Sequence, residues 1–111
     1  MEGFSNVEVE SPVIQKLRKT IAESPAQIEV QYAKSGNTWP DCVHTRVAIL
    51  NGQMFLLKKS PDYTPQKYAV LQSNFEKLSE RLEKLREEYK KNKKRPPQEV
   101  QDELLEMLHI L

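Results

Sequence analysis

Seven large apolar residues recur at heptad spacing between positions 68 and 89, and no other feature of the chain limits its fold as strongly. Successive members are three and four residues apart in alternation, so they lie along one side of a helix. These residues are Tyr68, Leu71, Phe75, Leu78, Leu82, Leu85 and Tyr89. The sequence therefore predicts a long amphipathic helix that packs against a partner, which the spacing does not identify.

Local signals predict where this helix begins and ends. Thr64 is placed to cap it, and Pro65 occupies its first position, where the missing N–H costs nothing. The basic run 90–95 leads into Pro96 and Pro97, which end a helix. A shorter helix is predicted from Pro97 onward, with an apolar stripe of Val100, Leu104, Met107, Leu108 and Leu111. Two such helices pair most simply as an αα-hairpin.

The beginning of the chain is predicted to hold a flexible segment and a short helix. Residues 1–10 are acidic and show no period, which predicts a flexible N-terminus. Ser11 as N-cap and Pro12 at the first position predict a helix over about residues 12–23. Pro25 is predicted to end it, because the residue before a proline disfavours the α conformation.

Alternating polarity predicts strands in the centre of the chain. Residues 26–32 alternate between apolar and polar, as in a half-buried strand. The segments 42–50 and 53–59 are joined by Asn51-Gly52, a pair that favours a type I′ hairpin turn. The turn fixes the register, so one hairpin face is expected to join the core: Val43, Thr45, Val47, Ile49, Met54 and Leu56. The other face is mixed and is expected to be partly covered or used for binding: His44, Arg46, Ala48, Phe55, Leu57 and Lys59.

The predicted fold class is therefore α+β. It comprises a short N-terminal helix, a three-stranded antiparallel meander, and a long helix plus a shorter helix as a C-terminal αα-hairpin. The flexible residues 1–10 precede one domain over 11–111, in which 11–60 form the helix and meander and 64–111 form the helical hairpin. A chain of 111 residues can bury a modest core without disulfides.

Composition limits the setting in which the chain works. Its charged residues make up 30% of the sequence, and no run approaches the roughly 18 apolar residues of a membrane span. The first residues lack a signal-peptide pattern. Cys42 is the only cysteine, so no disulfide or thiolate metal cluster is expected. The sequence predicts a cytoplasmic protein, or a nuclear one in a eukaryote, with no membrane partner, metal or cofactor.

The leading functional hypothesis is a non-catalytic protein–protein interaction or regulatory module, an adaptor or regulator. The last helix can cover about half of the heptad seam, so residues 68–78 should lie on the sheet or meet another protein. The expected partner is another protein or a second copy of the chain, although a parallel homodimer would place Arg81 against Arg86 of the other chain. The expected protein-binding residues are Trp39, Arg46, Phe55, Leu57, Tyr68, Leu71 and Phe75.

The alternative hypothesis is a small RNA- or DNA-binding protein. The run 90–95 holds five positive side chains in six residues, which could neutralise phosphates, and it is similar to a nuclear-import signal. A solvated loop between two helices accounts for the same lysines without a ligand. The expected nucleic-acid-binding residues are Lys58, Lys59, Lys67, Lys90, Lys91, Lys93, Lys94 and Arg95.

The predicted order of elements over about residues 12–80 resembles that of the double-stranded-RNA-binding domain. The resemblance implies phosphate-binding lysines near the start of the second helix, where Lys58, Lys59 and Lys67 lie, and a loop at Gly36-Asn37 that would enter the minor groove. It is a resemblance of element order alone.

The sequence carries no pattern typical of an enzyme. It has no phosphate-binding glycine loop, nucleophile elbow or paired-histidine zinc motif. His44 lies two residues from Cys42, but this pair lacks two further metal ligands and no carboxylate is placed to orient the histidine. We therefore expect no enzyme activity, and a small hydrolase using His44 is the least favoured hypothesis.

Overall fold

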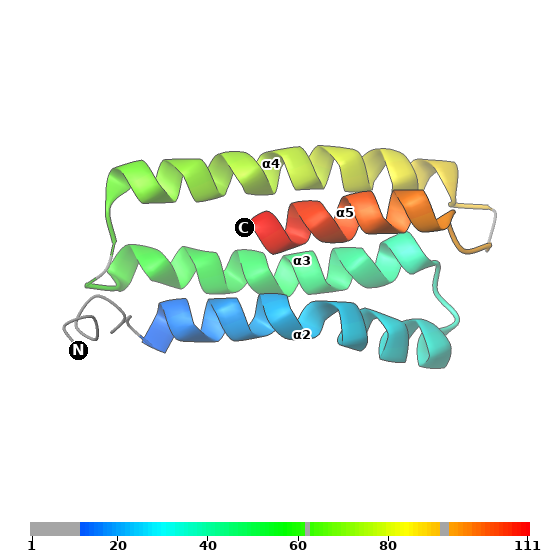
Figure 1. Cartoon of the computed structure of the whole chain (residues 1–111), viewed down its shortest axis with the longest axis horizontal. Helices are drawn as coiled ribbons and strands as arrows, with labels where there is room; N and C mark the ends of the chain where they lie inside the picture. The colour runs from blue at the N-terminus through cyan, green and yellow to red at the C-terminus, as the bar shows by residue number, and fades with distance from the viewer. Residues whose placement is uncertain (1–11, 62, 92–93) are drawn as a thin grey trace.

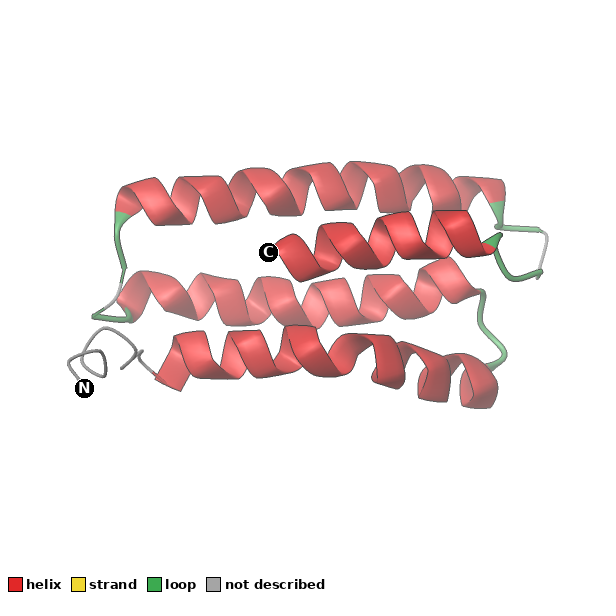
Figure 2. Cartoon of the chain, in the orientation of Figure 1, coloured by secondary structure: helices red, strands yellow, loops and turns green. Residues whose placement is uncertain are grey.

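The structure is a computed structural model that describes residues 12–61, 63–91 and 94–111. These ranges form four α-helices and one short 3-10 helix (Figure 1), and no strand occurs in them (Figure 2). The elements are α2 (Pro12–Ser35), α3 (Trp39–Leu56), η1 (Leu57–Lys59), α4 (Pro65–Glu88) and α5 (Gln98–Ile110). The predicted α+β fold class is therefore wrong, and the resemblance to the double-stranded-RNA-binding domain, which needs a sheet, does not hold.

The helices form an elongated bundle with dimensions of 51 × 25 × 23 Å. Helices α2, α3 and α4 run antiparallel to their neighbours, and α5 returns along the bundle to pack on α4 and α2 (Figure 1). None of the helices in the described ranges combines the length and apolar character that a membrane span requires. The predicted flexible N-terminus, 1–10, and the predicted cap Ser11 lie outside the described residues.

Helix α2 continues through the proline that was predicted to end it. Pro25 lies inside the helix, and the hydroxyl of the fully buried Ser24 donates to the carbonyl oxygen of Thr20 at 2.7 Å. A proline inside a helix costs about 3 kcal/mol. Continuing the helix brings Ile28 onto the same side as Ile21, and complete burial of one such side chain returns about 1.5–3 kcal/mol.

The predicted strand 26–32 belongs to this continued helix. Its alternating pattern would place Ile28 and Val30 on one buried face. Instead Ile28 is fully buried and Val30 is 45% exposed, as helical geometry requires of residues two positions apart. A helical period was present in the sequence, but the proline concealed it.

The predicted hairpin is helix α3, and Asn51-Gly52 lies inside it. Thr38 caps this helix by accepting a hydrogen bond from the Asp41 N–H at 3.2 Å, and Pro40 lies in its first turn. One side of the helix is buried at a three- and four-residue spacing, in the order Trp39, Val43, Val47, Leu50 and Met54. Of the predicted core face, Val43, Val47 and Met54 are buried, whereas Thr45, Ile49 and Leu56 are exposed.

The helical-hairpin prediction is confirmed at the C-terminal end of the chain. Thr64 caps α4, its side chain accepting from the Lys67 N–H at 3.3 Å with Pro65 next in sequence, and α5 begins after Pro97. Six of the seven seam residues are at most 9% exposed and the seventh, Tyr89, is partly buried. The seam packs on helices, not on a sheet.

Candidate protein-binding groove

Helix α5 is much shorter than the helices beside it. It has 13 residues, whereas α2 and α4 each have 24. The ion pair between Arg81 Nη2 and Glu103 Oε1, at 3.1 Å, fixes α5 beside the second half of α4, and its C-terminus stops about midway along the bundle (Figure 1). A difference of 11 residues leaves about 16 Å of the bundle without a fourth helix in the described chain.

A groove of about 370 Å³ lies where α5 stops. Its floor consists of core side chains that are between 5% and 9% exposed: Leu17, Ile21, Leu57 and Leu71. Ile14 extends the apolar surface toward the end of the bundle, and Leu111 borders it on the side of α5. The groove is therefore a continuation of the position that α5 occupies, lined by leucine and isoleucine.

The charged side chains of the groove are cationic. Arg18 on α2 and Lys67 on α4 line opposite walls, His109 lines the end beside α5, and no described residue of the lining is acidic. The described residues around this end of the bundle, 12–23, 47–61, 63–77 and 104–111, have seven basic side chains and three acidic ones. The basic residues are Lys16, Arg18, Lys19, Lys58, Lys59, Lys67 and Lys77, and the acidic ones are Glu23, Glu76 and Glu106.

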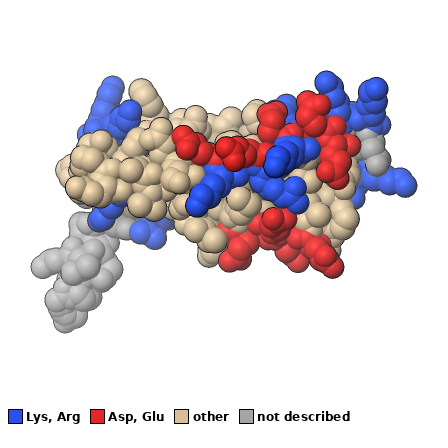
Figure 3. Space-filling view, turned by 90° about the horizontal axis from the view of Figure 1, so that it is seen from above, with Lys and Arg blue, Asp and Glu red and all other residues tan. Residues whose placement is uncertain are grey.

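The opposite half of the bundle has mixed charge. On the face seen in Figure 3, acidic side chains lie over the middle and right of the molecule, whereas the left end shows only uncharged and basic residues. Helices α2 and α4 begin at this left end, but α3 ends there and α5 ends at the groove, so the opposite ends of the helix dipoles offset one another and the positive charge comes from the basic side chains. The groove thus combines an apolar floor with a positive electrostatic environment.

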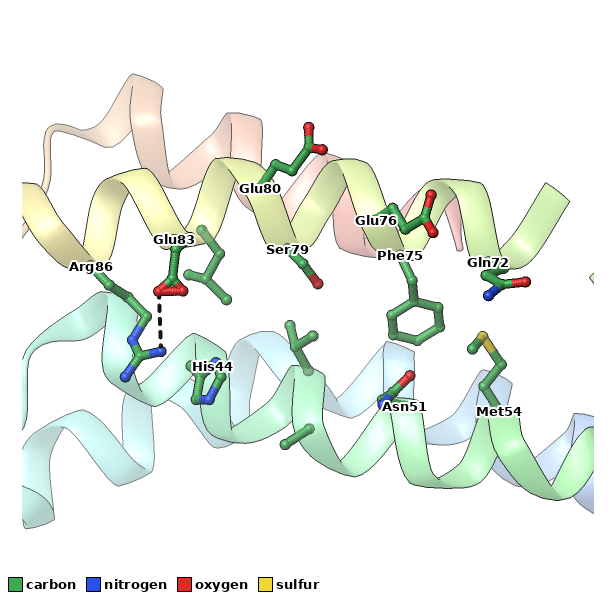
Figure 4. Close-up of a pocket in the computed structure, with 13 residues that line it drawn as sticks. His44, Asn51, Met54, Gln72, Phe75, Glu76, Ser79, Glu80, Glu83 and Arg86 are labelled. Atoms are coloured by element: carbon green, nitrogen blue, oxygen red, sulfur yellow. Dashed lines mark ion pairs between the residues drawn. The ribbon is translucent and has the colours of Figure 1, made fainter. Parts of the chain in front are cut away.

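A second and larger groove, about 750 Å³, lies between α3 and α4. Its lining is mixed. Polar groups come from His44 and Asn51 on α3 and from Gln72, Ser79 and three glutamates on α4 (Figure 4). Apolar surface comes from Val47, Ala48, Met54, Phe75 and Leu82. At one end Arg86 bridges the helices, with its Nε 3.0 Å from Asp41 Oδ1. Within the described residues, no group of three or more His, Cys, Asp or Glu could hold a metal ion.

The predicted protein-binding residues are divided between core and surface. Trp39, Tyr68 and Phe75 are at most 8% exposed, and the Trp39 indole N–H donates to Glu29 Oε2 at 3.4 Å. Trp39 and Tyr68 hold the bundle together, whereas Phe75 also lines the second groove, between α3 and α4.

The remaining predicted residues lie at the surface or in the groove. Phe55 is 58% exposed, with the Lys58 ammonium 5.6 Å from its ring centre. Arg46 is partly buried, and its Nε has no hydrogen-bond partner within the described ranges. Leu57 and Leu71 lie in the floor of the groove. The structure therefore brings Leu57 and Leu71 together in the groove. It also brings Phe55 and Tyr68 together around the Lys58 ammonium, which lies 5.1 Å from the centre of the Tyr68 ring.

The predicted nucleic-acid-binding residues do not form one patch. Lys58, Lys59 and Lys67 lie where η1 meets α4, whereas Lys90, Lys91, Lys94 and Arg95 lie at the other end of the 51 Å bundle, and Lys93 is outside the described residues.

Arg95 is held by contacts within the bundle. Its Nη1 donates to Glu29 Oε1 at 2.8 Å and its Nη2 to Gln101 Oε1 at 2.9 Å, and its guanidinium lies 5.5 Å from the centre of the Tyr32 ring. These contacts join the loop before α5 to α2. Arg95 therefore has a structural role in the bundle.

Sequence reasoning missed the α2 side of the groove. Residues 12–23 were predicted to form a short helix, and no part of it was expected to line a groove beside α4. The length difference between the two C-terminal helices was the available signal, because it predicted that the last helix covers only part of the seam. No known protein-family model, curated protein or solved structure matches this chain.

Proposed function

We propose that this chain is a non-catalytic protein-interaction module that receives a helix of another protein in the groove between α2 and α4. The observation that supports the proposal is the groove between α2 and α4, whose apolar floor of Leu17, Ile21, Leu57 and Leu71 lies beyond the last turn of α5 in the part of the chain that the structure describes. Laying the apolar face of an amphipathic helix into such a groove is a recurring mode of peptide recognition.

The energy of this interaction comes from the floor of the groove. Full burial of a leucine-sized side chain is worth about 1.5–3 kcal/mol. Two or three such side chains of the bound helix would therefore contribute a substantial part of its binding free energy. The floor residues already contact the bundle core, so docking does not require the module to refold. Leu57 and Leu71 then contribute to both stability and binding.

Selection of helical peptides from a random amphipathic library tests the proposal. The selected peptides should lose at least tenfold in affinity when the groove carries Ile14→Ser and Leu111→Ser, two residues that are only partly buried. Val70→Ser is the matched control, because Val70 is a 62% exposed residue of α4 outside the groove. Thermal unfolding confirms that each variant is folded. A library that yields only binders insensitive to the groove substitutions refutes the proposal.

Nucleic-acid binding is the second candidate function, and the basic end of the bundle is the observation that favours it. Binding through Lys58, Lys59 and Lys67 would weaken steeply with salt, with nearly one unit of slope in log affinity for each phosphate neutralised. Light scattering with a generic duplex RNA at low and high salt separates the two functions. The same measurement without RNA detects a homodimer.

A further inference from the structure

We infer that the second groove, between α3 and α4, binds a basic amphipathic helix of another protein. It shares no lining residue with the groove between α2 and α4, so this is a further interaction surface beyond the proposed function, and the two are tested independently. Three features of the described residues support the inference: the length of the second groove, its apolar floor, and the way in which charges are distributed around α4.

The second groove is long enough for a helix of about three turns. Its lining extends from His44 to Met54 on α3 and from Gln72 to Arg86 on α4, which corresponds to about 15 Å and about 21 Å along the two helices. All residues of α3 and α4 are described, so both walls are complete. A helix laid between two helices buries its apolar face against both of them.

The floor of the second groove is apolar, and small residues lie near its middle. The floor consists of side chains that are between 2% and 6% exposed: Val47, Met54, Phe75 and Leu82. Ala48 on α3 and Ser79 on α4 are exposed and short, so a bound helix can approach this floor closely. The inner face of that helix therefore needs large apolar residues at three- and four-residue spacing.

The charged residues of α4 are divided between two of its sides. Glu76, Glu80 and Glu83 are four and three residues apart, and all three line the second groove (Figure 4). Lys77 and Arg81 lie on the side of α5 instead. The α4 wall of the second groove is therefore acidic over about two turns.

Most of this negative charge is not neutralised within the described residues. Glu76 and Glu80 form no ion pair there. Arg86 is the only lysine or arginine of the lining, and it is already engaged by Asp41 at 3.0 Å and by Glu83 at 3.8 Å. A bound helix that carries lysine or arginine on the flank beside α4 is complementary to this wall.

The same glutamates disfavour a second copy of the chain as the occupant. Two copies packed antiparallel through this groove, centred near Ser79, would place Glu76 of each copy beside Glu83 of the other. A parallel arrangement would place Glu80 beside Glu80 of the second copy. Like charges brought together in this way disfavour association, and the phosphates of a nucleic acid would be repelled for the same reason. The occupant is therefore a basic segment of another protein.

Two designed helical peptides of about fourteen residues test the inference. Both carry leucine at positions i, i+3, i+4 and i+7; one has lysine at the flanking positions and the other has glutamate there. The basic peptide should bind the full chain at least tenfold more tightly than the acidic peptide, as measured by fluorescence anisotropy. Its affinity should fall as salt rises, because the flanking charges are exposed.

Reversal of the charges on α4 provides the second arm. Glu76→Lys with Glu80→Lys should weaken the basic peptide at least tenfold, since each exposed charge pair contributes up to about fivefold and reversal adds repulsion. The same variant should bind the acidic peptide more tightly than the unaltered chain does. Glu88→Lys with Glu106→Lys changes net charge equally outside the groove, and at physiological salt it should leave the affinity for the basic peptide within about twofold.

Obstruction of the second groove shows where the peptide binds. Ala48→Gln puts a longer side chain at its middle and should weaken the basic peptide at least tenfold. Ala26→Gln, at an exposed alanine of α2 outside the groove, should leave the affinity within about twofold. The Ile14→Ser and Leu111→Ser variant should do the same, because these residues line only the other groove. Thermal unfolding confirms that each variant is folded.

Four outcomes overturn the inference. Equal affinity for the two peptides shows that the acidic wall does not select the partner. Binding lost in the Ile14→Ser and Leu111→Ser variant but kept in Ala48→Gln places the peptide between α2 and α4. A dimer, detected by light scattering, that dissociates when the basic peptide binds assigns the second groove to another copy of the chain. Failure of the basic peptide to bind leaves the proposed function, which the peptide library tests separately, unaffected.

Discussion

Replacing Gly52 by alanine distinguishes a helix from a hairpin at this position. Gly52 lies inside α3, an added Cβ would meet no heavy atom within 4 Å, and the only positive φ in the described residues is that of Gly36. Alanine is favoured over glycine inside a helix by about 0.8–1.0 kcal/mol, partly because it restricts the unfolded chain. We therefore expect Gly52→Ala to raise the free energy of unfolding by about 0.5–1 kcal/mol, or Tm by about 2–8 °C.

Urea unfolding measured by far-ultraviolet circular dichroism and by the fluorescence of Trp39, the only tryptophan, gives this free energy. Gly36→Ala is the control, because this substitution should lower the free energy of unfolding instead of raising it. Gly36 has φ 74°, so alanine there should cost about 1–2 kcal/mol. In a type I′ turn Gly52 would also need a positive φ. A loss of stability in Gly52→Ala as large as that in Gly36→Ala would therefore refute the helical assignment of α3.

Three further predictions concern packing, capping and the buried thiol. Leu78→Ala should cost about 2–5 kcal/mol in urea unfolding because Leu78 is fully buried, whereas Val70→Ala, at a 62% exposed site, should change stability by less than about 0.5 kcal/mol; similar values would contradict the described core. Thr38→Ala should cost about 1 kcal/mol through loss of the cap on α3, and no effect on helix content or stability would argue against that helix start. Burial raises the pKa of the Cys42 thiol above its ordinary value, so the unfolded chain releases this proton first and stability should fall as pH rises above about 9. Cys42→Ala should remove that part of the pH dependence, and an unchanged profile would show that the thiol does not contribute.

The two errors of sequence interpretation in the first half of the chain have one physical origin. Strand propensities span only about 1 kcal/mol, and they depend on the neighbours that a residue finds in the folded protein. Burial of Val43, Leu50 and Met54 along one helical side is worth several times as much. Burial of apolar side chains against segments distant in sequence therefore outweighs two local preferences. One is the preference of Asn51-Gly52 for a turn, and the other is the energetic cost of Pro25 inside α2.

The candidate groove was predictable only in part. Leu57 and Leu71 were expected to bind a protein, and the shortness of the last helix was evident from the position of Pro97. Nothing in the local pattern indicated that α2 forms the other wall, since that depends on which helices pack together. Arg18 was for the same reason not singled out.

The sequence alone determined the C-terminal half of this protein: the heptad seam, the capped start of α4 at Thr64 and the restart after Pro97. These features depend on residues at most four positions apart, where spacing and backbone chemistry decide the conformation. Only the tertiary structure decided that α2 and α3 are continuous helices and that a basic, apolar groove remains beside α5. Both results come from burial between segments far apart in the chain, whose energy exceeds the local preferences that a sequence displays.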